Sequence, residues 1–218
     1  MGKYKVILFD LDGTLTDPVV GITKSVQYAL SKMDIQEPNL DKLTCFIGPP
    51  LHVSFAEFYS FTEEQTLLAV NHYRERFKDK GIYENVLYDG IVPLLKALKE
   101  QQYILVVATS KVTAFAEQII KYFQLDEYFD KIVGSNFDGT RSAKGEIIQY
   151  ILEGYQELSK DEFVMIGDRK YDVIGAKETG IDSIGVKYGY GSIEELKGSE
   201  PTQIVESVEE LTALLVGA

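Results

Sequence analysis

The sequence predicts an α/β protein with a doubly wound parallel sheet and a small helical domain inserted after the first strand. Three observations lead to this fold class. Short apolar runs alternate with helical patterns over most of the chain. One long region holds helical patterns but no strand pattern. The length, 218 residues, is sufficient for one core domain that carries a smaller insert.

The strand predictions depend on five short runs that are rich in β-branched and apolar residues. Continuous runs of this kind are typical of a parallel sheet that is buried on both faces. The predicted strands are residues 5–9, 103–108, 131–133, 162–166 and 182–186. Apolar residues at helical spacing predict helices over residues 91–100, 113–123, 144–158 and 171–179, and a closing helix over 207–216.

Residues 17–85 break the alternation of strands and helices. They contain helical patterns at residues 20–33, 51–58 and 63–80, but no clear strand. The sequence Gly48-Pro49-Pro50 interrupts the middle of this region, as expected for a break between helices. We therefore expect residues 1–16 and 86–218 to form the α/β core and residues 17–85 to form a helical cap.

Composition and charge narrow the classes of partner and the location. The formal net charge is -12 and the predicted pI is about 4.7, whereas nucleic-acid binders usually present a basic face. No run of 18 uncharged apolar residues is present, and the N-terminal segment lacks the pattern of a signal peptide. Cys45 is the only cysteine, so no disulfide can form within the chain. We expect a cytoplasmic protein with no nucleic-acid and no membrane partner.

Polar residues follow the predicted strands where each strand ends. The first strand is followed by Asp10-Leu11-Asp12-Gly13-Thr14, and the second by Thr109-Ser110-Lys111. The fourth ends in Gly167-Asp168, and Lys144 opens the helix that precedes it. In open parallel sheets ligands bind at the carboxyl ends of the strands, so we expect these side chains to meet in one site.

The residue types in this set favour phosphoryl transfer. Bringing Asp10, Asp12 and Asp168 together is unfavourable unless a cation neutralises them, and carboxylate oxygens suit Mg²⁺. Lys144 and the hydroxyl of Thr109 would bind the remaining phosphoryl oxygens. A carboxylate at Asp10 can form an acyl phosphate, and a second one at Asp12 can protonate the leaving oxygen and later activate water.

This set of motifs resembles the haloacid dehalogenase-like hydrolase superfamily, and in particular its phosphoglycolate phosphatase-like branch. The matching pieces are Asp10-Leu11-Asp12-Gly13-Thr14-Leu15, Thr109-Ser110-Lys111, Lys144, and Gly167-Asp168 followed four residues later by Asp172. They occur in the expected order over essentially the whole chain, and residues 17–85 fall where this branch carries its cap domain. The resemblance implies a phosphatase that forms an aspartyl-phosphate intermediate.

The resemblance also implies a role for each matching residue. Asp10 would be the nucleophile and a metal ligand, and Asp12 would be the general acid/base and bind the metal through its backbone carbonyl. Thr109 and Lys144 would hold the phosphoryl group. Asp168 would complete the Mg²⁺ site, and Asp172 would orient the metal's water shell. Dehalogenases of this superfamily generally lack the aspartate at the Asp12 position, so its presence favours phosphoryl transfer.

Substrate contacts are expected from residues that flank these motifs. We expect Gly13 and Ser110 to line the phosphate site. Gly13 also lets the chain turn tightly after the first strand. Further contacts are expected from three cations, namely Lys24 on the first cap helix, Lys111 and Arg141. The glycine-rich Tyr188-Gly189-Tyr190-Gly191 segment is interpreted as a flexible connection.

Several functional alternatives remain open at the level of sequence. The expected partner is a small phosphorylated metabolite, such as a phosphoglycolate-like, nucleotide-like or sugar-phosphate-like monoester. A phosphomutase of the β-phosphoglucomutase type would use the same motifs. A non-catalytic regulator that binds phosphorylated ligands is also conceivable, although a pure binder has no need for Asp12. The chain is expected to be a monomer or a weak homodimer.

Overall fold

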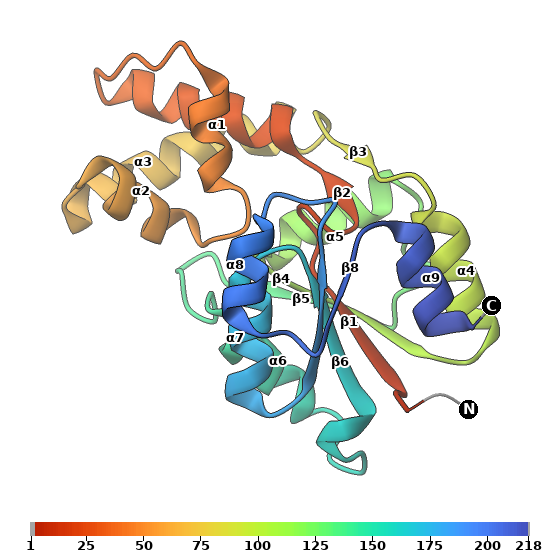
Figure 1. Cartoon of the computed structure of the whole chain (residues 1–218). Coiled ribbons are helices and arrows are strands. Elements are labelled where there is room, and N and C mark those ends of the chain that lie inside the picture. Colours follow the sequence, from red (N-terminus) through yellow and green to blue (C-terminus); the bar gives the residue numbers. More distant parts are fainter. Residues whose placement is uncertain (1–2, 218) are drawn as a thin grey trace. The chain divides into compact units, whose positions relative to one another are not determined.

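The computed structural model describes residues 3–217, which divide into two compact units (Figure 1). One unit consists of residues 3–17 and 87–217, and the other is the insert Pro18–Val86. The insert therefore begins and ends one residue later than residues 17–85, which were predicted as the helical cap. The chain passes between the units at β2 (Thr16–Asp17) and β3 (Val86–Leu87), which pair as a small two-stranded sheet.

The larger unit is built on a six-stranded sheet with the strand order β5-β4-β1-β6-β7-β8. All of its neighbouring strands run parallel. The strands are β1 (Val6–Phe9), β4 (Ile104–Val112), β5 (Lys131–Ser135), β6 (Phe163–Gly167), β7 (Asp182–Val186) and β8 (Gln203–Val205). The predicted fold class, a doubly wound α/β sheet with a helical insertion after the first strand, is confirmed.

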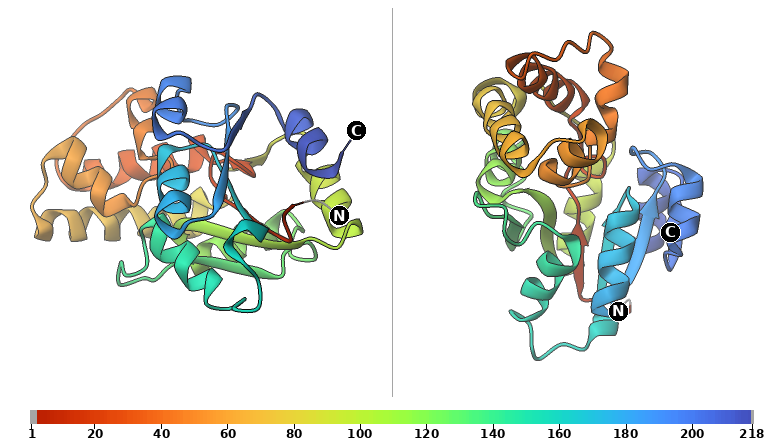
Figure 2. Two further views of the ribbon diagram at one scale, coloured as in Figure 1. Left: turned by 60° about the horizontal axis from the view of Figure 1, so that its bottom comes forward. Right: turned by 90° about the vertical axis from the view of Figure 1, so that its left-hand side faces the viewer.

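Helices lie on both sides of this sheet, as the views in Figures 1 and 2 show. They are α4 (Ile91–Glu100), α5 (Thr113–Tyr122), α6 (Lys144–Leu152), α7 (Lys170–Thr179), α8 (Ile193–Ser199) and α9 (Val208–Val216), with a short 3₁₀ turn η3 (Lys160–Glu162) before β6. Helix α4 packs against α9, and α7 packs against both α6 and α8. Two helical layers therefore cover the sheet, as a doubly wound fold requires.

The central strand β1 fixes where the site lies. All four of its residues are fully buried, because β4 and β6 flank it and helices cover it. Val6 and Leu8 belong to the same apolar cluster as Ile147 and Ile148 of α6. The register pairs Phe9 of β1 with Val107 of β4 and with Ile166 of β6. The polar residues at the carboxyl ends of these three strands therefore lie at one edge of the sheet.

The insert is a helical unit with its own core. Its elements are α1 (Val19–Lys32), a 3₁₀ segment η1 (Leu40–Phe46), α2 (Leu51–Tyr59), α3 (Glu63–Arg76) and a π-helical turn η2 (Phe77–Gly81). Phe46 makes an edge-to-face contact with Phe55, with ring centroids 4.9 Å apart. Helix α3 begins with a capping box in which Thr62 and Gln65 satisfy each other's backbone N–H groups.

The structure corrects some of the predicted elements. The helix predicted over residues 144–158 ends at Leu152, because turns begin with the Gly154 and Tyr155 N–H groups bonded to the carbonyls of Ile151 and Leu152. The helix predicted over 63–80 is α-helical only to Arg76 and continues as a π-helical turn. Strand β4 continues to Val112, beyond its predicted end. The elements β2, η1, β3, η3, α8 and β8 were not predicted from the sequence.

Within residues 3–217, no helix combines the length and apolar character that crossing a membrane would require.

Candidate active site

The turn after β1 places two aspartates at the edge of the sheet. Asp10 is almost fully buried, and its Oδ1 accepts a hydrogen bond of 2.7 Å from the Leu11 N–H. The Leu11 carbonyl accepts hydrogen bonds from the N–H groups of three residues that follow, namely Thr14, Leu15 and Thr16. These bonds fold the segment into a compact turn, so the Asp10 carboxylate is held by the local backbone.

Lys144 connects the turn after β1 with the helices on one side of the sheet. Its ammonium lies 3.0 Å from Asp10 Oδ1 and 2.8 Å from Asp172 Oδ1, and donates to the Ala108 carbonyl at 2.8 Å. Lys144 is the first residue of α6, and Glu146 fixes this helix start by accepting a hydrogen bond from the Ala143 N–H. The three donors of the ammonium are thus directed at three acceptors, which orients it next to Asp10.

Asp168, directly after β6, and Asp172, in the first turn of α7, lie close to Asp10. Asp172 Oδ2 accepts from the Arg169 N–H at 3.1 Å and so caps α7, while its Oδ1 faces Lys144. Asp168 is fully buried. Its Oδ2 accepts a 2.7 Å hydrogen bond from the Tyr190 N–H, and the Thr14 hydroxyl donates to its Oδ1 at 3.4 Å.

Asp10, Asp168 and Asp172 form a compact acidic cluster. One carboxylate oxygen from each lies within 4.8 Å of the others. Burial, together with the charges of Asp172 and Asp10, holds the pKa of Asp168 well above its usual range. Burial also raises the pKa of Asp172 to about 6, although the charge of Lys144 acts to lower it.

This cluster has the chemistry of a site for a hard cation. Three buried carboxylates this close together would be stabilised by a divalent positive charge, and their oxygens are the ligands that Mg²⁺ prefers. The residues present therefore fit a magnesium ion.

Lys144 is held in its charged form by its neighbours. Burial acts to lower its pKa, but the charges of Asp10 and Asp172 outweigh burial and raise the pKa above its ordinary value. Its positive charge therefore persists across the physiological range.

Asp12 lies outside the acidic cluster and pairs with a different cation. Its Oδ2 is 2.8 Å from the Lys111 ammonium, whereas its Oδ1 is buried without a hydrogen-bond partner among the described residues. Burial raises the pKa of Asp12, and the charge of Lys111 acts in the opposite direction. The structure therefore directs the Lys111 side chain at Asp12.

Gly13 allows the turn after β1 to pack against Asp168. It adopts a φ of +85°, and a Cβ atom at this position would lie 2.3 Å from Asp168 Oδ2. Thr109 is buried at the end of the same sheet edge, and its hydroxyl accepts a 3.3 Å hydrogen bond from the Lys111 N–H. Ser110, which lies between Thr109 and Lys111 in the sequence, is partly exposed.

Arg141 is tied to the loop in which it lies. Its Nε donates to the Gly134 carbonyl at 3.0 Å, and its Nη2 donates to Asn136 Oδ1 at 3.2 Å. Its guanidinium also lies 4.3 Å from the ring centre of Tyr150. These contacts stabilise the segment after β5, and any contact of Arg141 with a substrate would have to exchange or share them.

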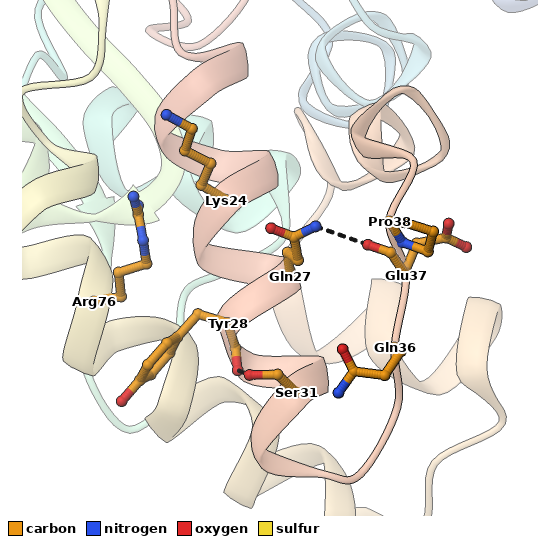
Figure 3. Close-up of a pocket in the computed structure, with 8 residues that line it drawn as sticks. All are labelled: Lys24, Gln27, Tyr28, Ser31, Gln36, Glu37, Pro38 and Arg76. Atoms are coloured by element: carbon orange, nitrogen blue, oxygen red, sulfur yellow. Dashed lines mark hydrogen bonds between the residues drawn. The ribbon is translucent and has the colours of Figure 1, made fainter.

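Lys24 lines a pocket of about 610 Å³ within the insert, shown in Figure 3. The pocket is bordered by polar side chains of α1, such as Gln27, and by Arg76 of α3. Lys24 lies 3.5 Å from Glu84, and Arg76 binds the same carboxylate through two nitrogens at 2.7 and 3.0 Å. The two cations therefore share one anion.

The segment 188–191 is the part of the site that the sequence interpretation missed. Gly191 lies so close to Asp168 that a Cβ atom on it would be 1.9 Å from the Asp168 carbonyl oxygen, and a Cβ on Gly189 would be 2.3 Å from Asp168 Cβ. The Tyr190 N–H binds the Asp168 carboxylate, and the Tyr190 hydroxyl donates to Asp17. The repeated glycines next to a strand end were the available signal: they permit close packing around Asp168.

Residues 7–186 match the family model described as haloacid dehalogenase-like hydrolase. The chain belongs to this family. The expected resemblance is thus confirmed, and so is the enzyme class, a phosphatase-type hydrolase. Two of the relatives carry the name phosphoglycolate phosphatase, and this is the branch that the motifs indicated.

Individual relatives cover nearly the whole chain. A 5'-nucleotidase from Pseudomonas aeruginosa is 48% identical over 213 residues, which are 98% of this chain and 96% of the relative. The tyrosine-protein kinase PtkA from Mycobacterium tuberculosis is 35% identical over 97% of this chain and 72% of its own length. The crystal structure of a "predicted phosphatase" from Clostridium acetobutylicum superposes with a TM-score of 0.96 at 51% identity, with full coverage of both chains.

Proposed function

We propose that this phosphatase hydrolyses small phosphate monoesters, foremost nucleoside 5'-monophosphates, in a Mg²⁺-dependent reaction through an aspartyl-phosphate on Asp10. The observation that carries the proposal is the buried arrangement of Asp10 next to Lys144 and inside a cluster of three carboxylates. The choice of nucleotides is supported by the 48% identity with a relative named 5'-nucleotidase. Phosphoglycolate and sugar phosphates remain comparison substrates.

Asp10 is suited to nucleophilic attack because its carboxylate is fixed in place beside an ammonium. Its Oδ1 is engaged by the Leu11 N–H and by the Lys144 ammonium, which together fix the plane of the carboxylate. In the first step an Asp10 oxygen forms a bond to phosphorus, and the bond between phosphorus and the ester oxygen breaks. The Thr109 hydroxyl and Lys144 are assigned to the phosphoryl oxygens, where negative charge is spread in the transition state.

Asp12 is assigned to proton transfer in both steps. As a general acid it would give its proton to the departing ester oxygen, and its raised pKa favours the protonated form that this step needs. In the second step the Asp12 carboxylate would take a proton from water. That water attacks phosphorus, the Asp10–phosphorus bond breaks, and inorganic phosphate leaves with Asp10 restored.

The proposed magnesium ligands are the side chains of Asp10 and Asp168 and the backbone carbonyl of Asp12, with Asp172 orienting the ion's water shell. When bound, the ion would reduce the repulsion between the anionic carboxylates and the anionic phosphate. The chain's contribution is to hold these oxygens in place, through the Tyr190 N–H on Asp168 and the Arg169 N–H on Asp172.

The proposal is tested by phosphate release from a panel of monophosphates, with and without Mg²⁺. The wild type should release phosphate most efficiently from nucleoside 5'-monophosphates, and chelation of the metal should stop the reaction. Asp10→Asn should lower turnover at least about a thousandfold. The matched control is Asp126→Asn, an exposed aspartate in the segment between α5 and β5, which should change nothing. Retained turnover in Asp10→Asn with an intact fold would refute the mechanism.

One further assay addresses the relative that is named a tyrosine kinase. The wild type is incubated with radiolabelled ATP and a tyrosine-containing peptide. A phosphatase that acts on monoesters predicts that no label is transferred to tyrosine, while label on tyrosine would contradict the assignment as a phosphatase.

A further inference from the structure

The ion pair between Lys111 and Asp12 lies next to the acidic cluster but is separate from it. The Lys111 ammonium is 2.8 Å from Asp12 Oδ2, and the two side chains are only 7% and 10% exposed. A pair this deeply placed is held in one geometry far more firmly than a surface ion pair. Its acidic member is the residue to which the proposed function assigns both proton transfers.

The backbone that carries Lys111 is firmly fixed. Lys111 lies within β4, inside the stretch between Ala108 and Val112 where the register with β5 shifts. Its carbonyl approaches β5 so closely that a Cβ atom on Gly134 would be 2.2 Å away. Its N–H donates to the Thr109 hydroxyl. Lys111 is therefore presented from a strand of the central sheet, which is a more rigid support than a loop.

The contact leaves the two oxygens of Asp12 unequal. Oδ2 is engaged by Lys111, whereas Oδ1 is buried with no hydrogen-bond partner among residues 3–217. A buried carboxylate oxygen without a partner is unfavourable in a resting protein, but it is the atom that must be available to exchange a proton with a substrate or a water. The ion pair thus selects which oxygen of Asp12 is left for chemistry.

We infer that Lys111 is a positioning residue for Asp12: it holds Oδ2 so that Oδ1 is aimed at the ester oxygen of the substrate. This inference rests on the proposed function, because it presupposes that Asp12 transfers protons. It replaces the direct substrate contact that the sequence suggested for Lys111. Lys144 and Thr109 remain the residues assigned to the phosphoryl group, so Lys111 acts on the leaving-group side of the reaction.

Substrates whose leaving groups differ in their need for a proton distinguish a residue that positions Asp12 from a residue that binds the phosphoryl group. A nucleoside 5'-hydroxyl must be protonated as it departs, whereas p-nitrophenolate is a stable anion that leaves without a proton. A residue that acts through Asp12 therefore matters for the nucleotide and hardly for p-nitrophenyl phosphate. A residue that binds the phosphoryl group matters equally for both, since the phosphoryl group is the same.

The test measures release of the leaving group in a single turnover, together with the inhibition constant of inorganic phosphate. Lys111→Met should slow nucleoside release about a hundredfold and p-nitrophenol release less than about threefold, with the inhibition constant unchanged. Lys111→Gln, whose amide can still donate to Asp12, should retain part of the nucleoside release. Lys121→Met, at an exposed position near the end of α5, is the matched control and should behave as wild type.

A double-mutant cycle with Asp12→Asn completes the test. If Lys111 acts through Asp12, adding Lys111→Met to Asp12→Asn should slow nucleoside release less than about twofold further. Equal losses for both substrates with a weaker affinity for phosphate would overturn the inference in favour of substrate binding. Unchanged nucleoside release in folded Lys111→Met would also overturn it. In either case a wild type that releases both leaving groups leaves the proposed function standing, whereas a wild type that releases neither refutes the proposed function itself.

Discussion

The core unit and the helical insert each gather charged side chains, and the two groups differ in depth and balance. In the core, the side chains of Asp10, Lys144 and Asp172 are only 1% to 4% exposed, whereas those of Lys24, Arg76 and Glu84 in the insert are 16% to 44% exposed. The core group belongs to a cluster of three carboxylates, two of which contact the Lys144 ammonium, and the insert group holds one carboxylate between two cations.

The pKa values of the acids reflect this difference. Hydrogen bonding from Arg76 holds the pKa of Glu84 below its usual value. Burial has the opposite effect in the core, where it raises the pKa values of Asp168 and Asp172. A partly exposed carboxylate that two cations contact is satisfied by its own partners, whereas an excess of buried carboxylate is typical of a site that binds a cation. The comparison therefore assigns the chemistry to the core, and it can be tested from both sides.

The largest effect is expected for Lys144→Met. Removing the one ammonium that faces Asp10 and Asp172 leaves buried carboxylates without their counter-charge, which should cost about 3–5 kcal/mol of unfolding free energy. Hydrolysis should fall at least about a thousandfold. Urea unfolding and phosphate release measure the two effects. A variant as stable and as active as the wild type would show that the buried group is not an electrostatic unit.

A smaller effect is expected for Gly191→Ala. The new Cβ atom would meet the Asp168 carbonyl oxygen, so the segment must shift by enough to cost about 1–3 kcal/mol. Since the neighbouring Tyr190 N–H holds the Asp168 carboxylate, Mg²⁺ should also bind more weakly in a calorimetric titration. The matched control is Gly198→Ala in α8, where nothing lies within 4 Å of the added atom. That substitution should be neutral or slightly stabilising.

The acidic cluster also predicts how stability depends on pH. A carboxyl whose pKa is raised in the folded state binds protons more strongly there, so its contribution is present at low pH and is lost as the pH rises through the folded pKa. For Asp172 this loss spans its unfolded value to about 6, and Asp168 acts in the same direction. Acids with lowered pKa values, such as Glu84, act in the opposite direction, but only below about pH 4.5.

Thermal unfolding in EDTA is the measurement. The Tm should fall between about pH 4.5 and about pH 7.5, and Mg²⁺ should reduce the fall because it binds the ionised carboxylates. Asp172→Asn should flatten the profile in EDTA. A Tm that rises with pH over this range in EDTA would contradict the assignment of raised pKa values to the cluster.

The smallest effect is expected for Lys24→Met in the insert. Lys24 is 44% exposed and its partner Glu84 keeps the two bonds from Arg76, so the unfolding free energy should change by less than about 1 kcal/mol. The variant also tests the expected substrate contact of Lys24. If Lys24 binds the substrate, loss of this contact should raise KM and leave kcat unchanged. A loss of stability as large as that of Lys144→Met would remove the contrast between the two groups.

Much of the fold could be predicted because its strands are continuous apolar runs. Strand β1 and helix α4 follow patterns that are typical of a buried parallel sheet and of an amphipathic helix. Strand β8 could not be predicted, since it has three residues and lies at the edge of the sheet, where little apolar sequence is needed. The helix that begins at Lys144 was predicted too long, because apolar residues at 155 and 158 pack on the core from turns rather than from a helix.

The meeting of the acidic residues was predictable for a different reason. Parallel strands deliver the residues at their carboxyl ends to one edge, so Asp10 and Asp168 could be placed together from their positions alone. The partner of Lys111 could not, because its choice between a substrate and Asp12 depends on side-chain direction and on the extension of β4. The packing of Gly191 against Asp168 depends likewise on a long-range contact that no local pattern encodes.

The central claim is that phosphate passes through the carboxylate of Asp10. Enzyme mixed with a labelled monophosphate and Mg²⁺ can be quenched in acid within the first turnover, and the acyl phosphate reduced with borohydride and located by peptide mass spectrometry. The account predicts that Asp10 is converted to homoserine in the wild type and remains aspartate without substrate. Rapid hydrolysis with no modification at Asp10, or with the modification at another carboxylate, would contradict it.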